Sequence, residues 1–319
     1  MPAYTCLFSS RRVDRENANF RRSEQTPSKK PSESACAQCR ARRYPTAMYL
    51  GICHEIFQGW KLEDAMRFAR DTGYDSIEIA PFTLGRPVTE IPVSERRSIR
   101  EAAARIGIRI SGIHWVLVQT EGLHLTHPDP QVRERTSRYF CDLVDFCADV
   151  GGQTIVVGSP KQRNLLEGVT FDEAWHWAGR TFEASIRQAE SRGITICFEP
   201  LAPSETNFIN TAEDAIRFVM ENRSPRFKII LDVKAMCSEA KAIPDIIRES
   251  WPDFAYFHAN DRNLKGPGFG DVDFVPIAAA LREVGYDGVV SVEVFNFDEG
   301  PEAIAQRSLE YLRKSFRRS

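Results

Sequence analysis

The sequence predicts an α/β fold, a (β/α)₈ barrel formed by residues 48–316. From Met48 onward, short apolar runs suited to buried parallel strands alternate with longer amphipathic stretches suited to helices. Eight such repeats fit within about 270 residues, which matches a closed barrel better than an open doubly wound sheet. An open sheet would also carry a glycine-rich phosphate turn after its first strand, and the segment Gly51–His54 lacks that spacing.

The expected strands are runs of five or six residues rich in apolar side chains: Tyr49–Cys53, Ser76–Ala80, Arg109–Ile113, Thr154–Gly158, Thr195–Glu199, Lys228–Asp232, Phe254–Ala259 and Val289–Val294. Helical segments follow them, for example Leu62–Thr72, Val132–Val150 and Phe171–Arg192. Several of these helices are followed at once by a glycine, which favours a left-handed cap: Gly73, Gly107, Gly151, Gly193 and Gly285. The barrel is therefore expected to form one domain.

Residues 1–47 differ from the rest in composition. They carry ten Lys and Arg against four Asp and Glu, a net charge of +6. The remaining residues carry 32 basic and 40 acidic side chains, a net charge of −8. The first stretch is rich in Ser, Arg and Pro and shows neither a helical nor a strand period. We expect a disordered basic extension, and the sequence leaves open whether it is present in the mature protein.

Composition also excludes several classes of function. Hydrophobic residues make up 42% and charged residues 27%, as in globular proteins with a substantial core. No apolar run reaches the roughly 18 residues that a membrane helix needs, so no membrane partner is expected. The acidic barrel segment does not suit nucleic acid. The eight scattered cysteines favour reduced thiols and a cytoplasmic protein over a disulfide framework.

Chemically active side chains stand at the ends of four consecutive predicted strands: Glu199, Asp232, His258 and Glu293. Catalytic groups of such barrels lie at the carboxyl ends of the strands. Three carboxylates meeting there would repel one another unless a cation lay between them. With one imidazole they form a three-oxygen, one-nitrogen set that suits Mn²⁺, Co²⁺, Mg²⁺ or Zn²⁺. We therefore predict one divalent metal ion as the cofactor.

Four short motifs carry these residues: Phe198-Glu199-Pro200, Leu231-Asp232, Phe257-His258-Ala259 and Val292-Glu293. Together they resemble the metal-ligand motifs of the xylose-isomerase-like sugar isomerase and epimerase superfamily. The segment Gly266–Phe274 resembles its loop and helix start after strand seven. Within the superfamily the sequence is most similar to the ketose 3-epimerases. The resemblance implies that Glu199 and Glu293 are catalytic and that Glu205 binds the sugar.

Two positions depart from the ketose 3-epimerase pattern. Those enzymes usually have a histidine three residues after the strand-six aspartate, where this chain has Ala235. They also place an arginine in the strand-seven loop, where this chain has Leu264 with Lys265 beside it. Lys265 is therefore a candidate substrate contact. The same loop lacks the histidines of the related DNA-repair endonucleases, which disfavours that activity.

Such a site can perform three reactions. A divalent ion that chelates a ketone and its neighbouring hydroxyl makes the α-proton easier to remove. Two glutamates on opposite faces of the carbon would then invert it. A single base would instead interconvert aldose and ketose, and loss of a β-hydroxyl would be dehydration, as in the inosose and dehydroshikimate dehydratases. If the protein is not an enzyme, the alternative is a metal-independent binding protein. The sequence does not identify the sugar or the native metal. It also leaves open whether the protein forms a homo-oligomer.

Four further residues are candidate contacts of a small sugar-derived substrate. His114 and Trp115 follow strand three, where the imidazole would bond a hydroxyl and the indole would stack on a sugar ring. Lys161 and Arg163 lie in the loop after strand four and are candidates for binding a phosphate or carboxylate. Glu78, in strand two, is expected to point toward the same mouth.

Overall fold

The computed structural model describes residues 48–319, and it contains a closed barrel of eight parallel strands that pair in chain order. The strands are β1 (Tyr49–Cys53), β2 (Ser76–Ile79), β3 (Arg109–Ile113), β4 (Thr154–Val157), β5 (Thr195–Phe198), β6 (Phe227–Asp232), β7 (Phe254–Ala259) and β8 (Val289–Val292). The pairing of β1 with β8 closes the barrel. The predicted (β/α)₈ fold is confirmed. The expected disordered extension, residues 1–47, lies outside the described residues.

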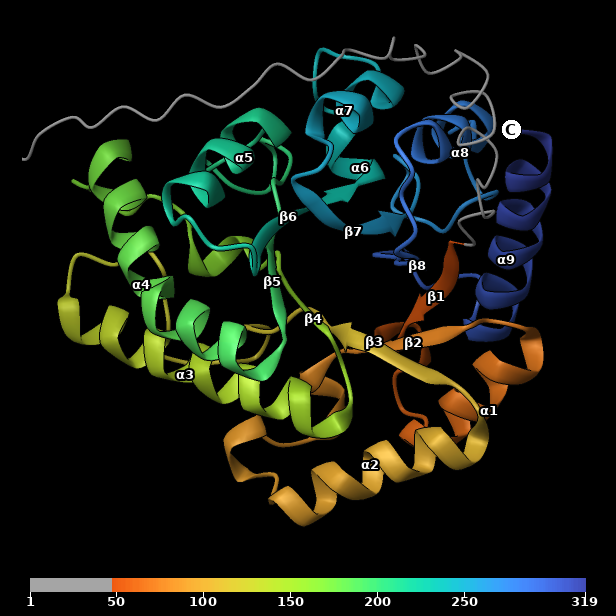
Figure 1. The fold of residues 1–319 in the computed structure, drawn as a ribbon, viewed down its shortest axis with the longest axis horizontal. Helices are drawn as coiled ribbons and strands as arrows, with labels where there is room; N and C mark the ends of the chain where they lie inside the picture. The colour runs from red at the N-terminus through yellow and green to blue at the C-terminus, as the bar shows by residue number, and fades with distance from the viewer. Residues whose placement is uncertain (1–47) are drawn as a thin grey trace, which may run out of the picture. The chain divides into compact units, whose positions relative to one another are not determined.

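Helices lie outside the strands and connect them (Figure 1). They are α1 (Leu62–Thr72), α2 (Val93–Ile106), α3 (Pro130–Val150), α4 (Phe171–Arg192), α5 (Ala212–Glu221), α6 (Val233–Met236), α7 (Ile243–Ser250), α8 (Phe274–Glu283) and α9 (Pro301–Arg318). Short 3₁₀ turns follow β1, β2 and β4. Among residues 48–319, no helix is both long and apolar enough to cross a membrane.

Helix α4 shows how local sequence sets the limits of these elements. Thr170 and Glu173 form a capping box at its start, in which each side chain accepts a hydrogen bond from the other's backbone N–H. Gly193 ends the helix with a φ of 71°, a left-handed conformation that costs glycine little. Between these signals, apolar side chains on one face are buried against the barrel. Sequence alone therefore predicted both ends of α4.

The alternation of side chains along each strand decides which residues enter the barrel. In β5, Ile196 and Phe198 belong to the large core between strands and helices, whereas Cys197 lies in a small inner cluster. That cluster also contains one residue from each of three neighbouring strands: Val156, Ile230 and Tyr256. Because the side-chain period of a strand is two, Glu199 points inward like Cys197. The same count directs Asp232, two residues after Ile230, to the inside.

Four of the strands, β2, β4, β5 and β8, end one or two residues earlier than predicted. Glu199 and Glu293 stand just beyond the ends of β5 and β8. Their backbone amides nevertheless continue the ladder, because Glu199 donates to the carbonyl of Val157 and Glu293 donates to that of Ala259. These bonds hold both glutamates in strand register and keep the direction of their side chains.

Candidate metal centre and active site

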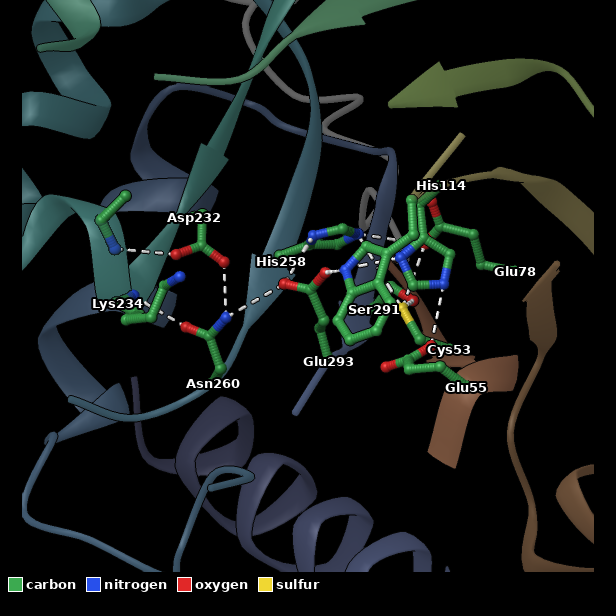
Figure 2. Close-up of polar contacts among 12 residues, drawn as sticks. Cys53, Glu55, Glu78, His114, Asp232, Lys234, His258, Asn260, Ser291 and Glu293 are labelled. Carbon is green, nitrogen blue, oxygen red and sulfur yellow. Dashed lines mark hydrogen bonds and ion pairs between the residues drawn. The ribbon is translucent and has the colours of Figure 1, made fainter. Parts of the chain in front are cut away.

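Four buried side chains meet at the carboxyl ends of β5, β6, β7 and β8: Glu199, Asp232, His258 and Glu293. Each offers one ligand atom, and these atoms lie within 4.8 Å of one another. Strand pairing places these residues at the same height along the barrel axis, since Asp232 of β6 lies opposite His258 of β7. Figure 2 shows His258 beside Glu293 in this group, with Asp232 joined to Glu293 through Asn260.

The electrostatics of the four residues fit a bound cation. Burial and the nearby Glu293 and Asp232 carboxylates raise the pKa of Glu199 to about 8. Burial also raises the pKa of Asp232 to about 6, although the Lys234 ammonium opposes this shift. A bound divalent ion would offset both causes of the raised pKa values. Its charge would neutralise the repulsion between the carboxylates, and it would stabilise their ionised forms in place of the water that burial excludes. Three carboxylates and one imidazole suit Mn²⁺, Co²⁺, Mg²⁺ or Zn²⁺.

Glu293 occupies a different environment from Glu199. Its burial favours the neutral acid, but His258 and His114 outweigh burial and hold its pKa well below the ordinary value. One carboxylate oxygen lies 3.2 Å from Nδ1 of His258. The other accepts a hydrogen bond of 2.8 Å from the indole Nε1 of Trp115. The two glutamates of the cluster therefore differ in protonation preference.

His258 is held from both sides. Its Nδ1 faces Glu293, while its Nε2 lies 3.1 Å from a carboxylate oxygen of Glu78 on β2. Glu78 is fully buried, yet its pKa is lowered, because the His258 and His114 imidazoles outweigh the effect of burial. Such a carboxylate fixes the tautomer and orientation of a metal-binding histidine. Cys53 lies on the same side, with its sulfur 3.4 Å from Glu78 and from the Ser291 hydroxyl.

The predicted aromatic and imidazole contacts also lie at this site. His114 is completely buried, with Nε2 2.8 Å from Glu55 and Nδ1 3.4 Å from Glu293. Trp115 is half-buried and stacks between Phe82 and Phe295, with ring centroids 5.8 and 5.7 Å away. The indole thus lines the mouth next to Glu293, whereas His114 lies beneath it.

The three remaining predicted cations occupy three different environments. Lys161 is exposed on the loop after β4. Arg163, two residues later, is completely buried and donates through Nη1 to the backbone carbonyl of Glu199 at 2.7 Å. Lys265 pairs with Glu299 at 2.7 Å. The expectation of one basic loop that presents both Lys161 and Arg163 to an anion does not match this arrangement, because Arg163 packs over the Phe198 ring inside the fold.

Glu205 lies at the mouth and is partly open, with 26% of its side chain exposed. One of its oxygens accepts a hydrogen bond of 2.7 Å from the Lys234 ammonium, and the other accepts from the backbone N–H of Ala202. The position that resembles a sugar-binding glutamate is therefore ion-paired in this chain.

Several residues of the site were not predicted from the sequence, namely Lys234, Asn260, Phe295, Glu55 and Gly158. Asn260 donates to both Asp232 and Glu293 and accepts from the backbone N–H of Lys234. The sequence held one signal for Asn260 and Lys234, because they stand one or two positions beyond the ends of β7 and β6. Residues at such positions can reach the same mouth as the strand ends themselves. That signal gave no sign that Lys234 would turn back toward Glu205.

Gly158 shows how closely β4 approaches the site. A Cβ at this position would lie 1.7 Å from Oε2 of Glu199. We expect Gly158→Ala to displace the Glu199 carboxylate and to lower the affinity for Mn²⁺ about tenfold, measured by calorimetry.

Gly179→Ala is the matched control, because the nearest atom to a Cβ there is 4.0 Å away. Its helix should be stabilised by up to about 1 kcal/mol with unchanged metal affinity. Equal affinities in both variants would contradict this account.

Comparison with known families identifies the barrel. The family described as "Xylose isomerase-like TIM barrel" matches residues 66–315. This chain belongs to that family. The membership agrees with the observed closed barrel of eight parallel strands.

Individual relatives of this xylose isomerase-like barrel are sugar epimerases. It is 28% identical to the D-psicose 3-epimerase of Ruminiclostridium cellulolyticum over 227 residues, which cover 70% of this chain and 74% of the relative. It is 24% identical to the 3-dehydro-D-guloside 4-epimerase of Escherichia coli, over 83% of this chain and 99% of the relative. A crystal structure of D-psicose 3-epimerase with D-tagatose from Clostridium cellulolyticum H10 has the same fold, with a TM-score of 0.75 and 22% identity over 84% of this chain and 99% of that one.

Proposed function

We propose that this protein is a metal-dependent sugar epimerase that inverts a carbon next to the carbonyl of a ketose or related keto-sugar. The observation that carries the proposal is the meeting of Glu199 and Glu293 in one buried cluster with Asp232 and His258. The relatives support the reaction class, since the named epimerases act at carbon 3 or carbon 4 of a sugar. The free thiols of the five described cysteines support a cytoplasmic location.

The four clustered residues would hold one divalent ion, Mn²⁺, Co²⁺, Mg²⁺ or Zn²⁺. When bound, such an ion acts as a Lewis acid that increases the acidity of the proton beside the substrate carbonyl. Asn260 and Glu78 would orient two of the ligands, Asp232 and His258, through the contacts described above. Trp115 would hold Glu293 in place and cover one side of the sugar.

The two glutamates would perform the proton transfers. In the barrel, β5 and β8 are separated by β6 and β7, so Glu199 and Glu293 reach the centre from different directions. One carboxylate takes the proton from the carbon, and the other carboxylic acid delivers a proton to the opposite face.

Isotope incorporation tests the reaction. The Mn²⁺-loaded protein, incubated in D₂O with D-fructose, D-tagatose or D-psicose, is expected to place deuterium at the inverted C3 and none at C1, as read by NMR. The label enters because the delivering acid exchanges its proton with solvent. Deuterium at C1 or C2 of an aldose product would establish an isomerase instead, and a new enone absorbance would establish a dehydratase.

A further inference from the structure

Lys234 is a buried cation at the mouth of the site. Only 7% of its side chain is exposed, and the ammonium makes one ion pair, 2.7 Å long, with Glu205. An ammonium has three N–H donors, and a buried donor without an acceptor is costly. Within residues 48–319, Glu205 is its one hydrogen-bond acceptor. Two donors are therefore available for an oxygen atom that the chain itself does not supply.

The surroundings of Lys234 place it beside the reacting groups. Its backbone N–H donates to Asn260, whose amide in turn donates to Asp232 and Glu293 (Figure 2). Its Nζ lies 3.8 Å from the centre of the Phe295 ring, and Phe295 stacks on Trp115, which donates to Glu293. Lys234 thus faces the mouth from the side of β6, opposite the Glu78 and His114 side of the cluster.

Its partner Glu205 fixes the kind of group that this pair accepts. An ammonium whose charge is already balanced by a carboxylate at 2.7 Å does not have a free charge for a second anion. A phosphate or carboxylate that approached Lys234 would also approach the Glu205 oxygens and be repelled. A hydroxyl group fits both partners, since it donates to the carboxylate and accepts from the ammonium.

The other basic side chains offer no separate anion site at this position. The Arg163 guanidinium is fully buried, donates to the backbone carbonyl of Glu199 and packs over the Phe198 ring, so it lies inside the fold and not at the mouth. Lys265 is paired with Glu299. These arrangements favour an uncharged substrate at the Lys234 side of the mouth.

We propose that Lys234 and Glu205 form a specificity-determining pair that binds one uncharged hydroxyl of the sugar and discriminates against a phosphorylated or carboxylated substrate. This inference rests on the proposed function, because it assumes that a sugar occupies the mouth. It concerns recognition only, so the pair acts in binding whichever carbon is inverted.

The test compares neutral and anionic probes on the Mn²⁺-loaded protein. Dissociation constants are measured by calorimetry for D-fructose, D-tagatose and D-psicose, and for D-fructose 1-phosphate and D-fructose 6-phosphate. We expect at least one neutral ketose to bind at least tenfold more tightly than both phosphates. Equal or tighter binding of either phosphate, or no binding of any neutral ketose, would overturn the pair's role. Binding of a ketose without exchange of its C3 proton would instead contradict the proposed epimerase function and leave the recognition pair standing.

Variants separate recognition from structural support. Lys234→Met should weaken binding of the best neutral ketose by about ten- to a hundredfold, with one Mn²⁺ per chain retained. Glu205→Gln should also weaken binding of the best neutral ketose. It should reduce the preference for the neutral ketose over the two phosphates, because it leaves the charge of Lys234 unbalanced. The double variant should lose less than the product of the two single losses. Lys314→Met, on the exposed face of α9, is the control and should change the affinity for neither the ketose nor the phosphates. Unchanged ketose binding in Lys234→Met, or an unchanged preference in Glu205→Gln, would overturn the proposal.

Discussion

Glu199→Gln and Glu293→Gln are each expected to lower the rate of epimerisation by about 10²- to 10⁴-fold, the usual contribution of a positioned acid or base. Glutamine keeps the size of the side chain but can neither take nor return a proton. Both assays are run with excess Mn²⁺, because each substitution also weakens a metal ligand. The rate is measured by NMR from deuterium incorporation and from the appearance of the epimer.

The two variants need not behave alike in D₂O. Since each glutamate serves one face of the carbon, one variant is expected to exchange the proton on its remaining active face while inversion stops. Glu167→Gln is the matched control, because Glu167 is exposed in the loop that follows β4 and should leave the rate unchanged. Full activity of either active-site variant, or of the wild-type protein after removal of metal with EDTA, would refute the two-glutamate metal site.

Glu78→Gln is expected to lower Mn²⁺ affinity by about ten- to a hundredfold, although Glu78 is not one of the four clustered ligands. Its carboxylate lies 3.1 Å from Nε2 of His258, and removing its charge weakens the hold on the imidazole orientation. The measurement is calorimetric titration of the metal-free protein with Mn²⁺, with circular dichroism to verify folding.

Glu55→Gln provides a control at the same depth. Glu55 is also fully buried and lies 2.8 Å from an imidazole, but that imidazole is His114, which is outside the four-residue cluster. We expect Glu55→Gln to change Mn²⁺ affinity much less than Glu78→Gln. If the two variants lose equal affinity, general disturbance of the buried polar groups, rather than orientation of His258, would explain the result.

Local signals in the sequence were sufficient for the barrel and for the position of its four central residues. Apolar runs and helix-end signals such as Gly193 act over a few residues, so they can be read without knowledge of the fold. Once the strands were located, their ends had to meet at one mouth. Glu199, Asp232, His258 and Glu293 were predicted for this reason, and the structure brings them together.

Only the tertiary structure decided the environment of each side chain, because contacts between distant segments depend on packing. Lys161 and Arg163 stand two residues apart, yet one is exposed and the other is buried over Phe198. Lys234 pairs with Glu205 across 29 positions of the chain, and the close approach of Gly158 to Glu199 spans two strands. Sequence therefore placed the four central residues at the mouth, whereas long-range packing determined which other residues join them, their partners, their charge balance and the kind of group they can bind.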